Sequence, residues 1–224
     1  MGLETDIERF GQEVETALSV FYAYQFASEL LAQDTSRFYQ NPHFWMIFLG
    51  SVQRTLFISL GRLYDPSNDA FTFQRFIKRC RANIEEFGRE YVERRKLESL
   101  RGQREPGRPE WLDDFLNKVC YAKIEDLDRL ARLARPFNRR MKEVYVEIRS
   151  KVFAHAILND ETVASILGQA NLKEIEDALT ALWSIYEQIS YLAYNGTDNL
   201  TFEARPYRYK DRVQEAVIMA LGIK

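Results

Sequence analysis

The chain has 224 residues, of which 46% are hydrophobic, enough for one good-sized core or a core with a helical appendage. A formal net charge of −2 gives no global attraction to nucleic acid or to an anionic membrane. The longest charge-free stretches are interrupted by polar residues or proline, so we predict no membrane span and no export signal. The two cysteines match no zinc or redox spacing, which predicts a reducing, cytoplasmic location.

Apolar residues recur every three or four positions through the first half of the chain, the spacing of amphipathic helices. The first predicted helix is long and covers about residues 4–33. Asn41-Pro42 is a cap followed by a first-turn proline, and it opens a helix over 42–64. Only two charges lie in this second helix, which predicts that it is the central element of the bundle. Thr72 caps the next helix, which runs to Phe87 or as far as Leu100.

The clearest break in the pattern is a segment near 101–110 with two prolines and two glycines, which predicts a loop or a mobile linker. Helical patterns resume after it, are broken or kinked at Pro136, and continue from Phe137 towards His155. Asn171 with Glu174 makes a capping box for a last long helix.

The segment 196–224 is predicted to be a C-terminal extension. It begins at Gly196 in a left-handed conformation and ends in a short helix. No alternating strand pattern and no internal repeat is present. The predicted fold class is therefore all-α. The chain is predicted to form one domain over 1–224, an up-and-down helical bundle with a long N-terminal helix and a short C-terminal helix.

Positive charge is concentrated between Arg129 and Lys151, where eight basic and two acidic residues give a local charge of +6. One interpretation is a solvated helix face with ion pairs to neighbouring acidic helices. The other is a surface for phosphate backbones, which respond to local fields more than to net charge. The residues predicted to bind RNA are Arg139, Arg140, Lys142 and Lys151.

The basic tract leads into Arg149, which is followed after five residues by His155, one of only two histidines in the chain. Imidazole titrates near neutrality, and a guanidinium grips phosphate at two points. Together they could bind a phosphodiester and transfer protons without a metal. The alternative is structural: His155 caps backbone carbonyls and Arg149 pairs with an acid on a neighbouring helix.

On a straight α-helix, Arg149 and His155 would lie about 120° apart around the axis and ~9 Å apart along it. They would not share a face. Either the helix ends or bends before His155, or a two-fold dimer completes the site with one pair from each copy. We predict that both side chains are accessible in a cleft, within reach of each other or of their dimer mates.

The Arg-x5-His element resembles the Arg-x4–6-His signature of HEPN domains, small helical bundles found in prokaryotic toxins, abortive-infection proteins and RNA-cleaving effectors. The segment from Phe44 through Leu60-Gly61-Arg62-Leu63-Tyr64-Asp65-Pro66 to Phe76 resembles the abortive-infection branch typified by AbiU. The resemblance spans about 44–192. One departure is Ser150, where active members often have Asn, Asp or His.

The resemblance implies a metal-independent endoribonuclease that needs no cofactor and acts as a homodimer. It implies attack of the RNA 2′-hydroxyl on phosphorus, with His155 as general acid or base, Arg149 on the phosphate and Ser150 orienting one of them. The implied setting is phage defence or a toxin–antitoxin pair, with an antitoxin or regulatory protein as a partner. Two alternatives stay open: a catalytically silent module that binds a protein, nucleotide or RNA, and a scaffold in which the motif is only packing.

Overall fold

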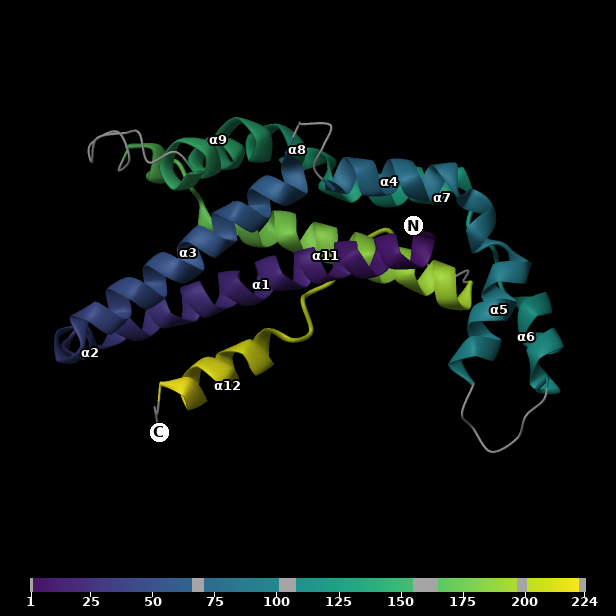
Figure 1. The fold of residues 1–224 in the computed structure, drawn as a ribbon, viewed down its shortest axis with the longest axis horizontal. Coiled ribbons are helices and arrows are strands. Elements are labelled where there is room, and N and C mark those ends of the chain that lie inside the picture. Colours follow the sequence, from purple (N-terminus) through teal and green to yellow (C-terminus); the bar gives the residue numbers. More distant parts are fainter. Residues whose placement is uncertain (1, 66–70, 101–107, 155–164, 197–200, 222–224) are drawn as a thin grey trace.

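The computed structural model describes residues 2–65, 71–100, 108–154, 165–196 and 201–221, and all regular elements in these ranges are helical (Figure 1). The all-α bundle with a long first helix and a short last one is therefore confirmed. Most of the predicted linker lies outside the described residues.

Two long helices run side by side from the N-terminus, and a third packs against the first. The first helix, α1 (Leu3–Gln33), turns through the short α2 (Ser36–Gln40) into α3 (Pro42–Tyr64), which returns alongside it (Figure 1). Near the end of the chain, α11 (Leu172–Asn195) lies along α1, and α12 (Lys210–Ala220) also packs on α1.

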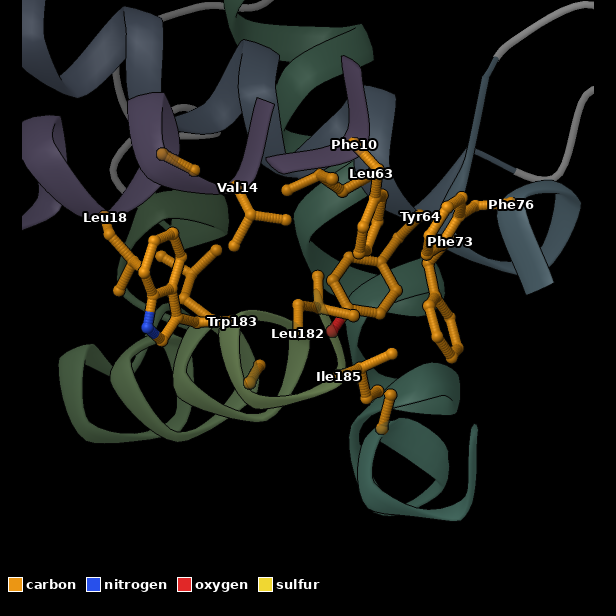
Figure 2. Packing of buried hydrophobic residues seen from close by; sticks show 14 of the residues in the cluster. Phe10, Val14, Leu18, Leu63, Tyr64, Phe73, Phe76, Leu182, Trp183 and Ile185 are labelled. Carbon is orange, nitrogen blue, oxygen red and sulfur yellow. The ribbon is translucent and has the colours of Figure 1, made fainter. Parts of the chain in front are cut away.

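The core fills the space between α1, α3 and α11 and extends to the start of α4 (Phe73–Ala82) (Figure 2). Phe10 of α1 stacks on Phe76 of α4 with ring centroids 4.2 Å apart. Tyr64, the last residue of α3, is enclosed beside them, and burial raises the pKa of its hydroxyl. The apolar spacing of three and four found in the sequence therefore marks the buried faces correctly for α1 and α11.

Helix α3 is not the central element that its low charge predicted. Most of its C-terminal half is buried from Leu56 onward, whereas Phe44, Met46 and Ile47 in the first half are exposed and only Trp45 there is buried. By length and composition alone, α3 is long enough and apolar enough to cross a membrane, a property that the sequence prediction overlooked. A low number of charged residues indicates that a helix is partly buried. It does not indicate which half of the helix the rest of the bundle covers.

The three capping residues were predicted correctly, but the capping box at Asn171 is not formed. The backbone N–H of Asn171 donates to the Tyr145 hydroxyl at 3.0 Å, and the Glu174 carboxylate accepts from Tyr145. Asn41, Thr72 and Asn171 each accept a hydrogen bond from the backbone N–H three residues later, at 3.2, 3.3 and 3.2 Å. Gly196 ends α11 with φ of +54°, the positive value expected of a glycine at this position. These interactions depend only on neighbours in the sequence, so the sequence alone identifies them.

The sequence predicted a helix from Thr72 that ends at Phe87 or continues to Leu100. The structure has a series of short helices in this region. The turns at Asn83 and Gly88 divide it. Two of the short helices project from the bundle as an arm (Figure 1) with a small apolar cluster of its own. The elements of this region are η1 (Ile84–Phe87), α5 (Arg89–Ser99) and α6 (Trp111–Lys118).

A buried arginine attaches the arm to the bundle. Arg95 of α5 is 3% exposed, and its Nε donates to Glu4 Oε1 at 2.7 Å. Its terminal nitrogen donates to the carbonyl oxygens of Glu86 and Ala193, at 2.6 and 3.0 Å. Burial raises the pKa of Glu4, but hydrogen bonds and charge from Arg95 and Arg94 outweigh it, so the pKa lies below its usual value. One guanidinium thus joins α5 to α1, η1 and α11.

We predict that Arg95→Met lowers the free energy of unfolding by about 3 kcal/mol or more, because it leaves buried acceptors without their donor. The matched control is Arg94→Met, which also removes a hydrogen bond to Glu4 but from a half-exposed side chain. This control is expected to cost less than about 1 kcal/mol. Urea unfolding followed by circular dichroism measures both values, and equal losses would contradict the role of Arg95.

Candidate functional site

The predicted site at Arg149 and Ser150 lies near the end of a continuous helical segment, Ile124–Ala154, which we call the long helical run. Its geometry changes between α, 3₁₀ and π along its length. Pro136 does not break this run. A 3₁₀ turn precedes it, which accommodates the missing N–H and the bulk of its ring. The successive elements are α7 (Ile124–Ala131), η2 (Arg132–Ala134), α8 (Arg135–Arg140), η3 (Met141–Tyr145), α9 (Val146–Ile148) and η4 (Arg149–Ala154).

Two of these elements, η3 and η4, are π-helical, and η4 begins at Arg149. A π-turn bonds residues five apart and holds more residues than an α-turn, so side chains rotate less from one residue to the next. The straight α-helix assumed for the Arg–His spacing is therefore wrong for this segment. Single π-turns within α-helices are frequent at functional sites. His155 itself lies outside the described residues.

Arg149 is held by an acid from a distant part of the chain. Its terminal nitrogen NH1 donates to Asp65 Oδ2 at 2.7 Å, and Asp65 is the C-cap of α3. The Arg149 side chain is 33% exposed, and that of Asp65 is 15% exposed. A guanidinium has five N–H donors in a fixed fork, so this pair fixes the position of Arg149 and leaves donors for a second anion.

The arginine reaches Asp65 by crossing α3 at a glycine. A Cβ placed on Gly61 would lie 2.1 Å from Arg149 Cδ and 3.0 Å from its Cγ and Nε. Only a residue without a side chain fits there while Arg149 keeps this position. Gly61 and Asp65 are four residues apart, so they share one face of α3. The sequence contained this signal in its Gly-Arg-Leu-Tyr-Asp segment, but sequence reasoning did not connect it to Arg149.

Aromatic packing fixes the rest of the π-turn on α3. The ring of Phe153 stacks on Phe57 with centroids 5.3 Å apart, and Tyr145 stacks on the same ring at 6.2 Å. Ser150, next to Arg149, is half-buried and makes no hydrogen bond through its hydroxyl to the described part of the chain. In the same part of the chain, no cluster of three or more His, Cys, Asp or Glu side chains could hold a metal ion.

The four residues predicted to bind RNA all have protein partners. Three of them pair with carboxylates and one bonds to an amide oxygen, as the ion-pair interpretation of the basic tract expects. Exposed pairs of this kind contribute little to stability and can be exchanged for phosphate, so their role in RNA binding stays a prediction. The partners are Glu143 for Arg139 (2.8 Å), Glu174 for Arg140 (3.3 Å), Gln74 for Lys142 (3.5 Å) and Glu147 for Lys151.

An all-α bundle with an Arg-x5-His element late in the chain agrees with the HEPN resemblance found in the sequence. The family model of the AbiU2 branch of HEPN domains matches residues 3–214, and the chain therefore belongs to this family. This confirms the resemblance found in the sequence and makes the chain an abortive-infection HEPN-type domain. No curated protein and no solved structure matches it.

We predict that Gly61→Ala displaces Arg149 from Asp65 and lowers the free energy of unfolding by about 1–3 kcal/mol, the usual cost of overpacking. Gly50→Ala on the same helix is the matched control, because no atom lies within 4 Å of the position of its Cβ. It is expected to stabilise α3 by about 0.5–1 kcal/mol. Calorimetry gives the stabilities, and NMR of the Arg149 Nε–H reports the displacement. An unshifted Arg149 signal in Gly61→Ala would refute the contact.

Proposed function

We propose that the protein is a metal-independent endoribonuclease that acts in phage defence or as the toxin of a toxin–antitoxin pair. The observation that carries the proposal is the placement of Arg149. Its side chain is one-third exposed at the start of a π-turn and is positioned by Asp65 and Gly61. A cation held in place before substrate arrives can stabilise developing negative charge without reorganisation during the reaction.

In the proposed reaction, the 2′-hydroxyl of RNA loses its proton and attacks the adjacent phosphorus. The bond from phosphorus to the 5′-oxygen of the next nucleotide breaks, that oxygen takes up a proton to become a 5′-hydroxyl, and a 2′,3′-cyclic phosphate remains. His155 acts as general acid or base in these proton transfers. Arg149 holds the phosphate and stabilises the phosphorane-like transition state, and Ser150 orients one of the two.

A second candidate function is a catalytically silent HEPN-like module that binds a protein, a nucleotide or RNA. The ion pair between Arg149 and Asp65 favours this alternative, since a neighbouring carboxylate neutralises part of the charge that a phosphate would meet. The substitution of Ser150 for the Asn, Asp or His of active members favours it as well. The two candidates differ in whether purified protein cuts RNA.

We predict that His155→Ala lowers the rate of RNA cleavage by about 10²–10⁴-fold, the usual contribution of general acid–base catalysis. His43→Ala is the control, because the only other histidine is exposed at the start of α3. Cleavage of labelled RNA by wild-type protein should persist in EDTA and give cyclic-phosphate ends. Full activity in His155→Ala, or a strict metal requirement, would assign the chemistry to other residues. No cleavage by wild-type protein would favour the silent module.

We also propose a symmetric homodimer that buries part of the helix 137–155 and brings two Arg–His pairs to one cleft. Light scattering after size exclusion should give twice the chain mass. A monomer at micromolar concentration would contradict the composite cleft. Cytoplasmic location and an antitoxin or regulatory protein as partner complete the proposal.

A further inference from the structure

A cavity of about 710 Å³ opens where α4 meets α7 and α8. Its floor includes the buried side chains of Phe73 and Ile77 together with Ala131, and its rim carries exposed arginines. This volume lies in the range of ligand-binding sites. The described lining includes neither Arg149 nor the residues that contact it, so the cavity is separate from the candidate catalytic site.

Three of the lining residues are arginines at regular spacing in the sequence, Arg129, Arg132 and Arg135, and we call them the arginine row. They are three residues apart, and the 3₁₀ turn η2 begins at Arg132 and ends just before Arg135. A 3₁₀ helix has three residues per turn and a rise of about 6 Å per turn, so side chains at this spacing stack along one face. The 3₁₀ turn therefore places Arg132 and Arg135 on one face of the helical run, and Arg129, three residues earlier, is a surface neighbour of Arg132.

No acidic side chain among the described residues neutralises the arginine row. Arg132 and Arg135 form no ion pair with any side chain in the described ranges, and both are exposed. Arg129 lies over the ring of Phe202, 5.0 Å from its centroid, a contact that leaves its charge uncompensated by an acid. The three side chains therefore bring positive charge to the lining of the cavity.

The acids of the cavity do not cancel this charge. The carboxylate of Asp128 is 2.5 Å from Arg81, which also lines the cavity, so that pair is neutral. Glu125 is the one remaining acid in the described lining. Asn138 of α8 also lines the cavity, and its buried Oδ1 has no hydrogen-bond donor among the described residues.

The partners of the basic residues separate the long helical run into two groups. Arg139, Arg140, Arg149 and Lys151 each pair with a carboxylate. Within the described part of this helical run, Ile124–Ala154, the three arginines without a carboxylate partner are those of the arginine row. An ion pair lowers the gain from binding a phosphate, because the carboxylate must be displaced or its repulsion tolerated. The row is therefore the part of the basic tract best suited to phosphates.

We propose that this cavity is where the phosphates of a single-stranded RNA are held away from the cleavage site, by Arg129, Arg132 and Arg135. The inference rests on the proposed action on RNA. Successive arginines one helical turn apart can each meet a different phosphate of an extended strand, and each guanidinium can bind two phosphate oxygens. The apolar floor offers a surface for a base between them.

The test measures binding separately from cleavage. The probe is a fluorescein-labelled, mixed-sequence single strand of 2′-O-methyl RNA, which lacks the attacking hydroxyl. Arg132→Gln with Arg135→Gln should weaken binding at least tenfold. It should also reduce the slope of log K against log salt by about 1.4, since each phosphate contact on a single strand contributes about 0.7. The control, Arg94→Gln with Arg208→Gln, removes the same charge from exposed arginines elsewhere and should leave the slope unchanged.

The outcomes separate this inference from the proposed nuclease. A smaller slope of log K against log salt in Arg132→Gln with Arg135→Gln supports the inference even if wild-type protein cuts no RNA. An unchanged slope overturns it even if cleavage is efficient. No binding of the probe to wild-type protein overturns it as well. If inorganic tripolyphosphate or a nucleoside triphosphate binds through the same arginines and RNA does not, the cavity is a small-ligand site and the inference is wrong.

Discussion

The position of the signature arginine depends on the missing side chain of Gly61. Arg149 lies across α3 at a distance that any Cβ would forbid, and only from there does it reach Asp65. This crossing brings together two segments that are 84 residues apart in the chain. The stacked rings of Phe57 and Phe153 hold the same two helices at the same spacing. The absence of a side chain at Gly61 on α3 therefore determines which charged group lies next to Arg149 on another helix.

Arginine has three distinct roles in this molecule, and burial and partners separate them. Arg95 is enclosed by carbonyl oxygens and a carboxylate, where its charge serves attachment of the arm and is inaccessible to a ligand. Arg149 is intermediate, with one acid for positioning and donors left for substrate. Arg132 and Arg135 face a cavity without an acid to pair with in the described chain. The amino-acid composition does not distinguish these arginines, because their roles depend on burial and partners in the tertiary structure.

Features that depend on near neighbours could be predicted from the sequence, and those that depend on distant contacts could not. The caps at Asn41, Thr72 and Asn171 and the ends of α1 and α3 were predicted because their signals are local. The exposure of the first half of α3 was missed because it depends on which helices cover it. The crossing at Gly61 was missed for the same reason. Within the candidate site, the structural alternative expected Arg149 to pair with an acid on a neighbouring helix, and the structure identifies that acid as Asp65. The catalytic role of Arg149 stays a prediction.

The π-turn at Arg149 also has a consequence for how this helix tolerates insertion and deletion. A π-turn is an α-turn that has taken in one additional residue without breaking the helix. Deleting one residue between Arg149 and Ala154 would let the turn relax to α-geometry, and the helix would stay anchored on α3. In a helix that was already α-helical, the same deletion would rotate every later side chain by about 100°. The variable number of residues between arginine and histidine in the HEPN signature is the kind of length change that such a turn absorbs.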